Sequence, residues 1–181
     1  MILKNLFKRQ PYAKSSQDLY HAIVQQSRQP VFYLEAEVPD TVDGRYEMIS
    51  LHSFLVMRRL KKDDEDLQPL SQAVFDHMFA DMDQSLREIG VGDLGVGKRI
   101  KEMAKVFYGR IVAYETALDG GEESLEAALL RNHYGTLEEA PTSQSVSSLA
   151  RYVRENDEFL KDQKTSDLKA GRVEFRQFEA V

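Results

Sequence analysis

The sequence predicts an all-α, single-domain bundle of about six helices. Apolar residues recur at three- and four-residue intervals over several long segments, and strands do not alternate with these segments. The chain has 181 residues, of which 42% are hydrophobic and 30% are charged. That length and balance suit one soluble domain with its own core. We expect short loops between the helices, apart from an extended segment near 31–44 and a glycine-rich helix–helix corner at 90–97.

The first predicted helix begins near Ser15, whose spacing from Asp18 resembles a capping box. Its apolar residues follow helical spacing, and it should end before Pro30, because the residue before a proline disfavours the helical conformation. Residues 31–44 hold β-branched residues and two turn-forming pairs. We interpret them as an extended connection that packs its aromatic residues inward.

The second helix should be the centre of the core, because residues 45–61 are apolar on nearly every side. A charged run follows, and then Ser71 can cap the next helix. The glycine-rich corner comes after that helix. The remaining helices are expected over 72–89, 97–119, 122–134 and from Thr142 or Ser143 to about 163.

The two ends of the chain are predicted to differ from the helical domain at 15–163. Residues 1–14 form a basic arm, and residues 164–181 form a tail whose weak alternation indicates a short strand or an arm. Residues 1–17 contain four basic residues and no acidic one, so they carry a charge of +4. Because the net charge of the chain is −6, the remaining residues carry −10. Apolar and basic residues in 1–12 could form a short segment that contacts an anionic membrane. Alternatively, the apolar residues of the arm could pack onto the helical domain. The residues expected at such a membrane contact are Leu3, Lys4, Leu6, Phe7, Lys8 and Arg9.

Composition excludes several classes of function. An acidic chain argues against binding nucleic acid by overall charge. The absence of cysteine removes disulfides, zinc–thiolate sites and cysteine nucleophiles. Many serines are present, but none lies in a G-x-S-x-G nucleophile elbow. We therefore predict no catalytic residues, no metal and no cofactor.

Two motif-like features resemble known kinds of binding site. The stretch from Gly92 to Lys98 fits most of a phosphate-binding loop, but Arg99 replaces the Ser or Thr that would touch magnesium, and a helix precedes it in place of a strand. A glycine-capped link between helices is favoured, with anion binding at the start of the next helix as an alternative. On helix 72–89, His77 and Asp81 could share a metal, but an interaction face is favoured.

Three stretches together resemble the ubiquinol–cytochrome c chaperone family: FYLEAEVPDTVDGRYEMISLHSFLVMRRL at 32–60, SQAVFDHMFADMDQSLREIGVGDLGVGKRIKEMAKVFYGR at 71–110 and AALLRNHYG at 127–135. The resemblance implies an all-helical, non-enzymatic chaperone that assembles the cytochrome bc1 complex (respiratory complex III) and holds its subunit cytochrome b. Mitochondrial members also work with a small partner protein. The chain is expected to be a compact bacterial form without their long N-terminal extension.

The resemblance also places the expected site. The 71–110 block is its most specific part, so partner binding is expected there. The protein is expected to be cytoplasmic or held peripherally at the inner membrane. A peripheral membrane adaptor without chaperone action, binding anionic lipid or an acidic partner, is the alternative. The expected partner-binding residues are Asp76, Asp81, Asp83, Arg87, Glu88, Asp93, Lys98 and Arg99. The glycines expected to shape the corner are Gly90, Gly92, Gly95 and Gly97.

Overall fold

The all-α prediction is confirmed by a computed structural model, which describes residues 12–61 and 67–180. Over those residues the chain forms eight helices and no strand. The two helices beyond the predicted six, α2 and α8, have only four and five residues. The helices are α1 (Ala13–Ser27), α2 (Val31–Leu34), α3 (Val42–Lys61), α4 (Gln68–Glu88), α5 (Asp93–Leu118), α6 (Leu125–His133), α7 (Ser143–Lys161) and α8 (Thr165–Lys169).

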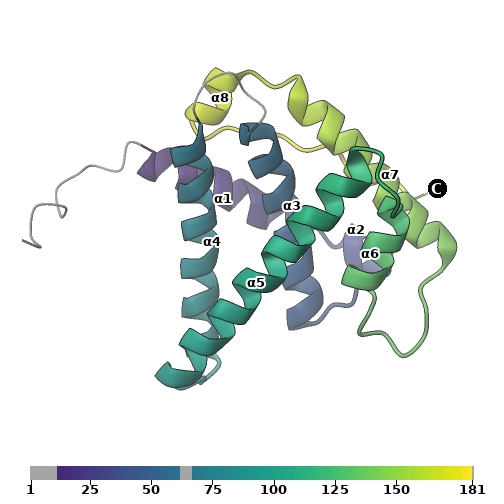
Figure 1. Ribbon diagram of the computed structural model, residues 1–181, viewed down its shortest axis with the longest axis horizontal. Helices are drawn as coiled ribbons and strands as arrows, with labels where there is room; N and C mark the ends of the chain where they lie inside the picture. The colour runs from purple at the N-terminus through teal and green to yellow at the C-terminus, as the bar shows by residue number, and fades with distance from the viewer. Residues whose placement is uncertain (1–11, 62–66, 181) are drawn as a thin grey trace, which may run out of the picture.

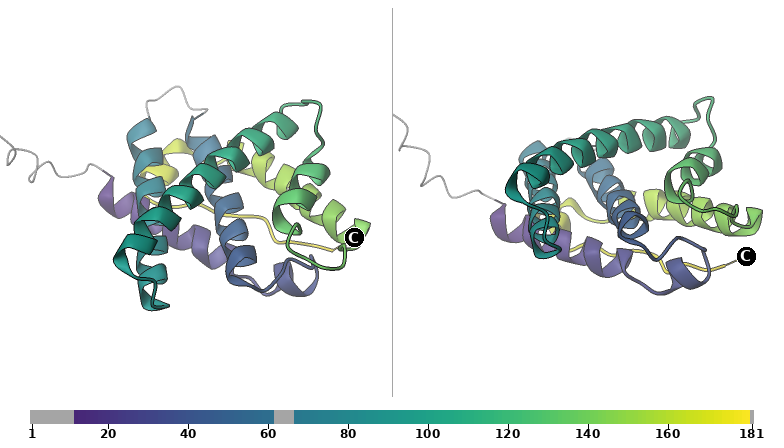
Figure 2. Two further views of the ribbon diagram at one scale, coloured as in Figure 1. Left: turned by 60° about the horizontal axis from the view of Figure 1, so that its bottom comes forward. Right: turned by 90° about the horizontal axis from the view of Figure 1, so that it is seen from below.

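Helix α3 lies at the centre of the molecule, as its apolar sequence predicts. It contacts α1, α4, α5, α6 and α7. Figure 1 shows α5 crossing in front of α3 and α4, and the right view of Figure 2 shows α5 and α1 on opposite sides of α3. A helix covered on so many sides must be apolar around most of its circumference, which explains why α3 has no clear polar face.

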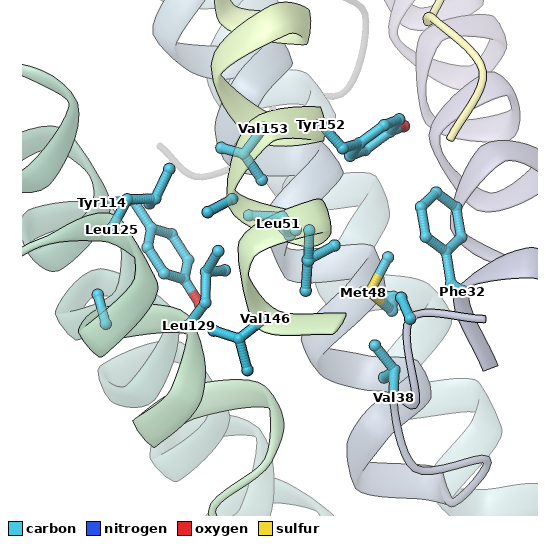
Figure 3. Packing of buried hydrophobic residues seen from close by; sticks show 14 of the residues in the cluster. Phe32, Val38, Met48, Leu51, Tyr114, Leu125, Leu129, Val146, Tyr152 and Val153 are labelled. Carbon is cyan, nitrogen blue, oxygen red and sulfur yellow. The ribbon is translucent and has the colours of Figure 1, made fainter. Parts of the chain in front are cut away.

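Two clusters of buried side chains pack against α3. In one, Leu51 of α3 lies near Tyr114 of α5 and Val153 of α7 (Figure 3). In the other, α1, α4 and α5 cover the remaining side of α3, with Leu19 and Phe107 fully buried. Each such side chain stabilises the fold by about 1.5–3 kcal/mol relative to an exposed one. The clusters fix α3, α4 and α5 relative to one another, and these three helices form most of the site described below.

The predicted extended segment at 31–44 is confined to residues 35–41. Helix α2 occupies 31–34 because Pro30, at φ −55°, already has the backbone angle of a first helical turn. Helix α3 begins at Val42, where the Thr41 Oγ1 accepts a hydrogen bond from the Gly44 backbone N–H at 3.1 Å. Gly44 is therefore helical, and a Cβ there would lie 1.9 Å from the Pro39 carbonyl oxygen. This glycine allows the backbones of α3 and Pro39 to approach closely. It does not form the turn that its sequence context predicts.

Two predicted helix caps are wrong for the same reason, namely that each helix starts earlier than its Ser suggests. Ser15 lies inside α1, and its hydroxyl donates to the Lys169 carbonyl at 2.6 Å, which ties α1 to α8. Ser71 lies inside α4, whose N-cap is Leu67. By contrast, Thr142 caps α7 as expected, accepting from the Ser145 backbone N–H at 3.1 Å.

The glycine-rich corner lies where the sequence predicts it but is shorter. Gly90, at φ +89°, ends α4 in the left-handed conformation. Its N–H donates to the Arg87 carbonyl, and the next N–H, of Val91, donates to the Leu86 carbonyl, which completes a Schellman motif. Gly92 is the N-cap of α5. The other two predicted corner glycines, Gly95 and Gly97, are residues of α5.

The C-terminal residues pack onto the bundle. After α8, residues 172–180 run without regular structure across the molecule (Figure 2). The side chain of Gln163, just after α7, pairs with both backbone groups of Glu174, donating at 2.7 Å and accepting at 3.0 Å. Phe178 enters the core with 6% of its surface exposed. The predicted tail thus contributes to the core as an extended strap that is not paired in a sheet.

Candidate functional site

A cavity of about 550 Å³ lies between the start of α3, the end of α4, the middle of α5 and the end of α6. We call it the α5 groove. These four consecutive helices meet there because α5 crosses α3 and α4 diagonally (Figure 1). Its lining residues are Val42, Asp43, Gly44, Tyr46, Glu47, Leu86, Ile89, Arg99, Glu102, Met103, Val106, Arg110, Arg131, Asn132, His133, Gly135 and Thr136.

The rim of the α5 groove combines three exposed apolar residues with the exposed charged residues Asp43, Arg99, Glu102 and Arg131. Val42 of α3 is 74% exposed, Ile89 just after α4 is 65% exposed, and Val106 of α5 is 38% exposed. Single exposed apolar residues are ordinary on a protein surface, but several around one concave site mark a place where another molecule can be held. A second hollow of about 200 Å³ shares Val42 and Ile89 with the groove and extends toward α1.

An ion pair crosses the floor of the groove. Arg110 of α5 donates to both carboxylate oxygens of Glu47 of α3, with N–O distances of 2.8 and 2.9 Å. Glu47 has 8% of its surface exposed. Burial raises the pKa of Glu47, and the Arg110 guanidinium offsets part of that effect. The pair holds α3 and α5 at a fixed separation, which keeps the groove open.

Buried polar groups from α6 line the end of the groove. Burial lowers the pKa of His133 to about 3, and the positive charge of Arg110 adds to the effect, so this histidine is neutral at physiological pH. Asn132 donates to the Tyr114 hydroxyl at 3.3 Å, while its Oδ1 has no hydrogen-bond partner within the described residues. A neutral histidine held inside the fold is poorly placed to carry charge for acid–base chemistry at the surface. The groove is suited to binding.

The predicted partner-binding residues do not converge on this groove. Arg99 lines it, and Asp81 lines the smaller hollow beside it. Asp81 also accepts from the Tyr20 hydroxyl at 2.8 Å, joining α4 to α1, and together with burial this raises the pKa of Tyr20. Lys98 is exposed on another face of α5.

The other members of the predicted set hold the corner together. Arg87 bridges Asp83, one helical turn earlier in α4, and Asp93 at the start of α5. Such exposed pairs usually contribute about 0–1 kcal/mol each, so their main effect is to fix the local geometry. Asp76 and Glu88 each accept a hydrogen bond from a glutamine of the same helix. Their role in partner binding stays a prediction.

The expected membrane contact in residues 1–12 falls almost wholly outside the described residues, so Leu3, Lys4, Leu6, Phe7, Lys8 and Arg9 stay a prediction. Among the described residues, none of the helices combines the length and apolar character that crossing a bilayer requires. No group of three or more His, Asp or Glu side chains in the described part of the chain could hold a metal ion.

Sequence reasoning missed the groove because no single segment encodes it. The core periodicity of 97–119 correctly marks Phe107 and Tyr114 as buried, but Val106 lies off that stripe. An apolar residue off the core stripe was the available signal, and Ile89 at the helix end was a second one. That Val106 and Ile89 meet around one groove depends on the crossing of α4 and α5, which periodicity does not specify.

Comparisons with known proteins agree on one family. The family model described as "Ubiquinol-cytochrome C chaperone" matches residues 34–175. The chain is 25% identical over 159 residues to ubiquinol-cytochrome c reductase complex assembly factor 1 of Mus musculus, covering 87% of this chain and 53% of that protein. The Xenopus laevis protein of the same name is 23% identical over 142 residues, covering 78% of this chain and 70% of that protein. The chain thus spans about half the length of its mouse relative.

A solved structure is also similar. The crystal structure of the Cbp3 homolog from Brucella abortus matches with a TM-score of 0.80 and 40% sequence identity, covering 93% of this chain and 92% of that one. The similarity therefore includes the elements that form the groove.

Proposed function

We propose that this chain, which belongs to the ubiquinol-cytochrome C chaperone family, acts as an assembly factor of the ubiquinol–cytochrome c reductase (bc1) complex. The family match and the names of the mouse and Xenopus relatives support this function. On this proposal the protein is non-enzymatic, and its client is a bc1 subunit, with cytochrome b the expected one. The small partner protein of mitochondrial members is a further expected contact.

The observation that supports a holding function is the set of exposed apolar residues on the rim of the α5 groove. A chaperone for a membrane subunit must cover apolar segments of its client while the client is outside the bilayer, and burial of apolar surface supplies the attraction. Val42, Ile89 and Val106 place exposed apolar surface around a cavity with a rigid floor. A helix whose apolar face enters the groove would be held in the helix-in-groove mode.

A complementation experiment tests this function. The gene is deleted in the organism that encodes it, and assembled bc1 complex is measured on native gels together with the cytochrome b absorbance. Loss of both, restored by the wild-type gene, is expected. Normal complex and normal spectra in the deletion strain would refute the assembly function.

Groove variants locate the activity. Ile89→Asp with Val106→Asp should fail to restore the complex, because a charge on the rim opposes burial of an apolar client. Leu34→Asp is the matched control, since Leu34 is 78% exposed and lies away from the groove. Tagged wild-type protein should co-purify cytochrome b, and the double variant should not. Full rescue by the double variant would move the client site elsewhere.

A further inference from the structure

Helix α5 carries a second surface that the groove does not use. Its residues 94, 98, 101, 105, 108 and 112 follow alternating spacings of four and three, so they lie within about 40° of one line along the helix. At about 1.5 Å per residue, that line is about 27 Å long. Its members are Leu94, Lys98, Lys101, Lys105, Tyr108 and Val112, and we call them the α5 stripe.

The α5 stripe faces away from the core. The three buried residues of α5, Val96, Phe107 and Tyr114, lie on the opposite side of the helix. In the right view of Figure 2, α5 runs along one side of the molecule, and none of the other helices covers its outer side. Leu94 is 96% exposed, and Val112 is 64% exposed. Tyr108 packs one side of its ring against Phe75 of α4 and is 55% exposed. The stripe is therefore a long, convex surface that the fold leaves mostly open.

The lysines of the stripe are unpaired, although acidic residues are close in sequence. Lys98, Lys101 and Lys105 are all exposed, and within the described residues none of them makes an ion pair. Glu102 lies one helical turn from both Lys98 and Lys105, about 80° around the helix from the line of the stripe, and within the described residues it makes no ion pair with either lysine. Most of the other basic residues that the structure describes are paired, so free positive charge is concentrated here.

Charge and shape together select the occupant. A line of lysines with a leucine at one end and a tyrosine and a valine at the other combines anion attraction with apolar insertion, which is the pattern of a helix that lies in a membrane interface. The lysine stems can lie along the apolar surface while their ammonium groups reach phosphate. A folded acidic partner would need a concave face 27 Å long to match this convex stripe, whereas a membrane surface is large and deformable.

We propose that the α5 stripe binds an anionic phospholipid surface with the helix axis parallel to the membrane. This contact is separate from the one predicted in residues 1–12, and it would place the α5 groove beside the bilayer.

The test uses the purified full chain, with residues 1–12 unchanged in every variant, and co-sedimentation with vesicles of equal parts phosphatidylglycerol and phosphatidylcholine. Wild type should bind these vesicles, bind less in raised salt, and not bind pure phosphatidylcholine. K98Q/K101Q/K105Q should lower the partition coefficient by about 100-fold, since each lysine near an anionic surface contributes roughly fivefold.

A charge-matched control separates the stripe from overall charge. R28Q/K164Q/R172Q removes three exposed cations outside α5 and should bind like wild type. Both triple variants are first shown to melt like wild type, because all six positions are exposed. If the stripe variant binds as tightly as wild type, the proposal is wrong and the N-terminal arm becomes the membrane contact.

The apolar members distinguish a membrane from an acidic protein. L94S/V112S should lower binding to the anionic vesicles several-fold while leaving binding to poly-glutamate unchanged. Equal loss for both probes, or strong binding of wild type to poly-glutamate without binding to vesicles, would overturn the membrane assignment in favour of an acidic protein partner.

Discussion

His52 should make the protein lose stability as the solution is acidified from pH 7 to pH 5. It is fully buried on α3, and both ring nitrogens have partners. Nδ1 lies 2.8 Å from the Met48 carbonyl, which fixes it as the donor, and Nε2 lies 2.8 Å from the Tyr152 hydroxyl, from which it accepts. Burial lowers its pKa from 6.5 to about 4. The neutral imidazole is thus part of the folded structure.

The sign of the effect follows from which state binds the proton. Between pH 6.5 and about 4, the unfolded chain protonates His52 and the folded chain does not. The stabilisation is therefore complete above pH 6.5 and declines as the pH falls through this window. At pH 5 the loss from this one residue is about 2 kcal/mol, calculated from the two pKa values. His133, whose pKa is lowered to about 3, should add a similar amount.

Urea unfolding at pH 7 and pH 5 measures this loss. In the variant His52→Asn, the difference between the two pH values should be about 2 kcal/mol smaller than in wild type. His21→Asn is the control, because His21 is exposed. Since His52→Asn could fail to fold, the imidazole signals of wild type are also followed by NMR. A His52 pKa near 6.5, or an unchanged pH dependence in a folded variant, would refute the reasoning.

Two further predictions concern the backbone and the buried charges. Gly90→Ala should lower the free energy of unfolding by about 1–2 kcal/mol, because it places a side chain at φ +89°. Gly109→Ala should raise it by about 0.5–1 kcal/mol, because Gly109 lies mid-helix and a Cβ there would meet nothing within 4 Å. Equal effects of the two substitutions in thermal melts would contradict both predictions. Arg58→Leu should cost about 1.5–3 kcal/mol, because the buried Asp157 carboxylate loses its hydrogen bond from the Arg58 Nε at 2.9 Å but keeps its ion pair with Lys161 at 3.0 Å. In urea titrations, the double variant Arg58→Leu/Asp157→Leu should regain most of the free energy of unfolding that Arg58→Leu loses. If it regains none, the loss in Arg58→Leu comes from altered packing and not from the buried charge.

Helical periodicity predicted the long helices well because those helices are amphipathic or fully buried. The failures lie where local chemistry competes with tertiary contacts. Gly44 has the sequence context of a turn, yet it lies in α3, where the Pro39 carbonyl oxygen leaves no room for a side chain. Likewise Ser15 resembles a cap but binds the Lys169 carbonyl far along the chain. Neither contact partner is close in sequence, so neither role could be inferred from local pattern.

The candidate site was predictable only as a region. The resemblance pointed to residues 71–110, and seven groove-lining residues do lie there, among them Ile89, Val106 and Arg110. The charged residues within that block were the obvious choice, but Arg87 pairs with both Asp83 and Asp93 at the corner. Mutual pairing of charges depends on how α4 turns into α5. Asp83 and Arg87 are four residues apart on one helix, a spacing that favours a pair, but the spacing does not reveal Asp93 as the third member.

Helix α5 has features that folding alone does not explain. Only three of its 26 residues are buried. It also contains Gly97 and Gly109, around which a Cβ would meet nothing within 4 Å. An exposed glycine inside a helix costs about 0.5–1 kcal/mol relative to alanine, so these two glycines weaken α5. A surface shaped only by stability would replace both. Both glycines flank the α5 stripe, about 60° to either side of its line, where a missing side chain lets a surface approach the lysine stems closely. If Gly97→Ala/Gly109→Ala stabilises the fold but weakens vesicle binding, the glycines serve the contact and not the fold.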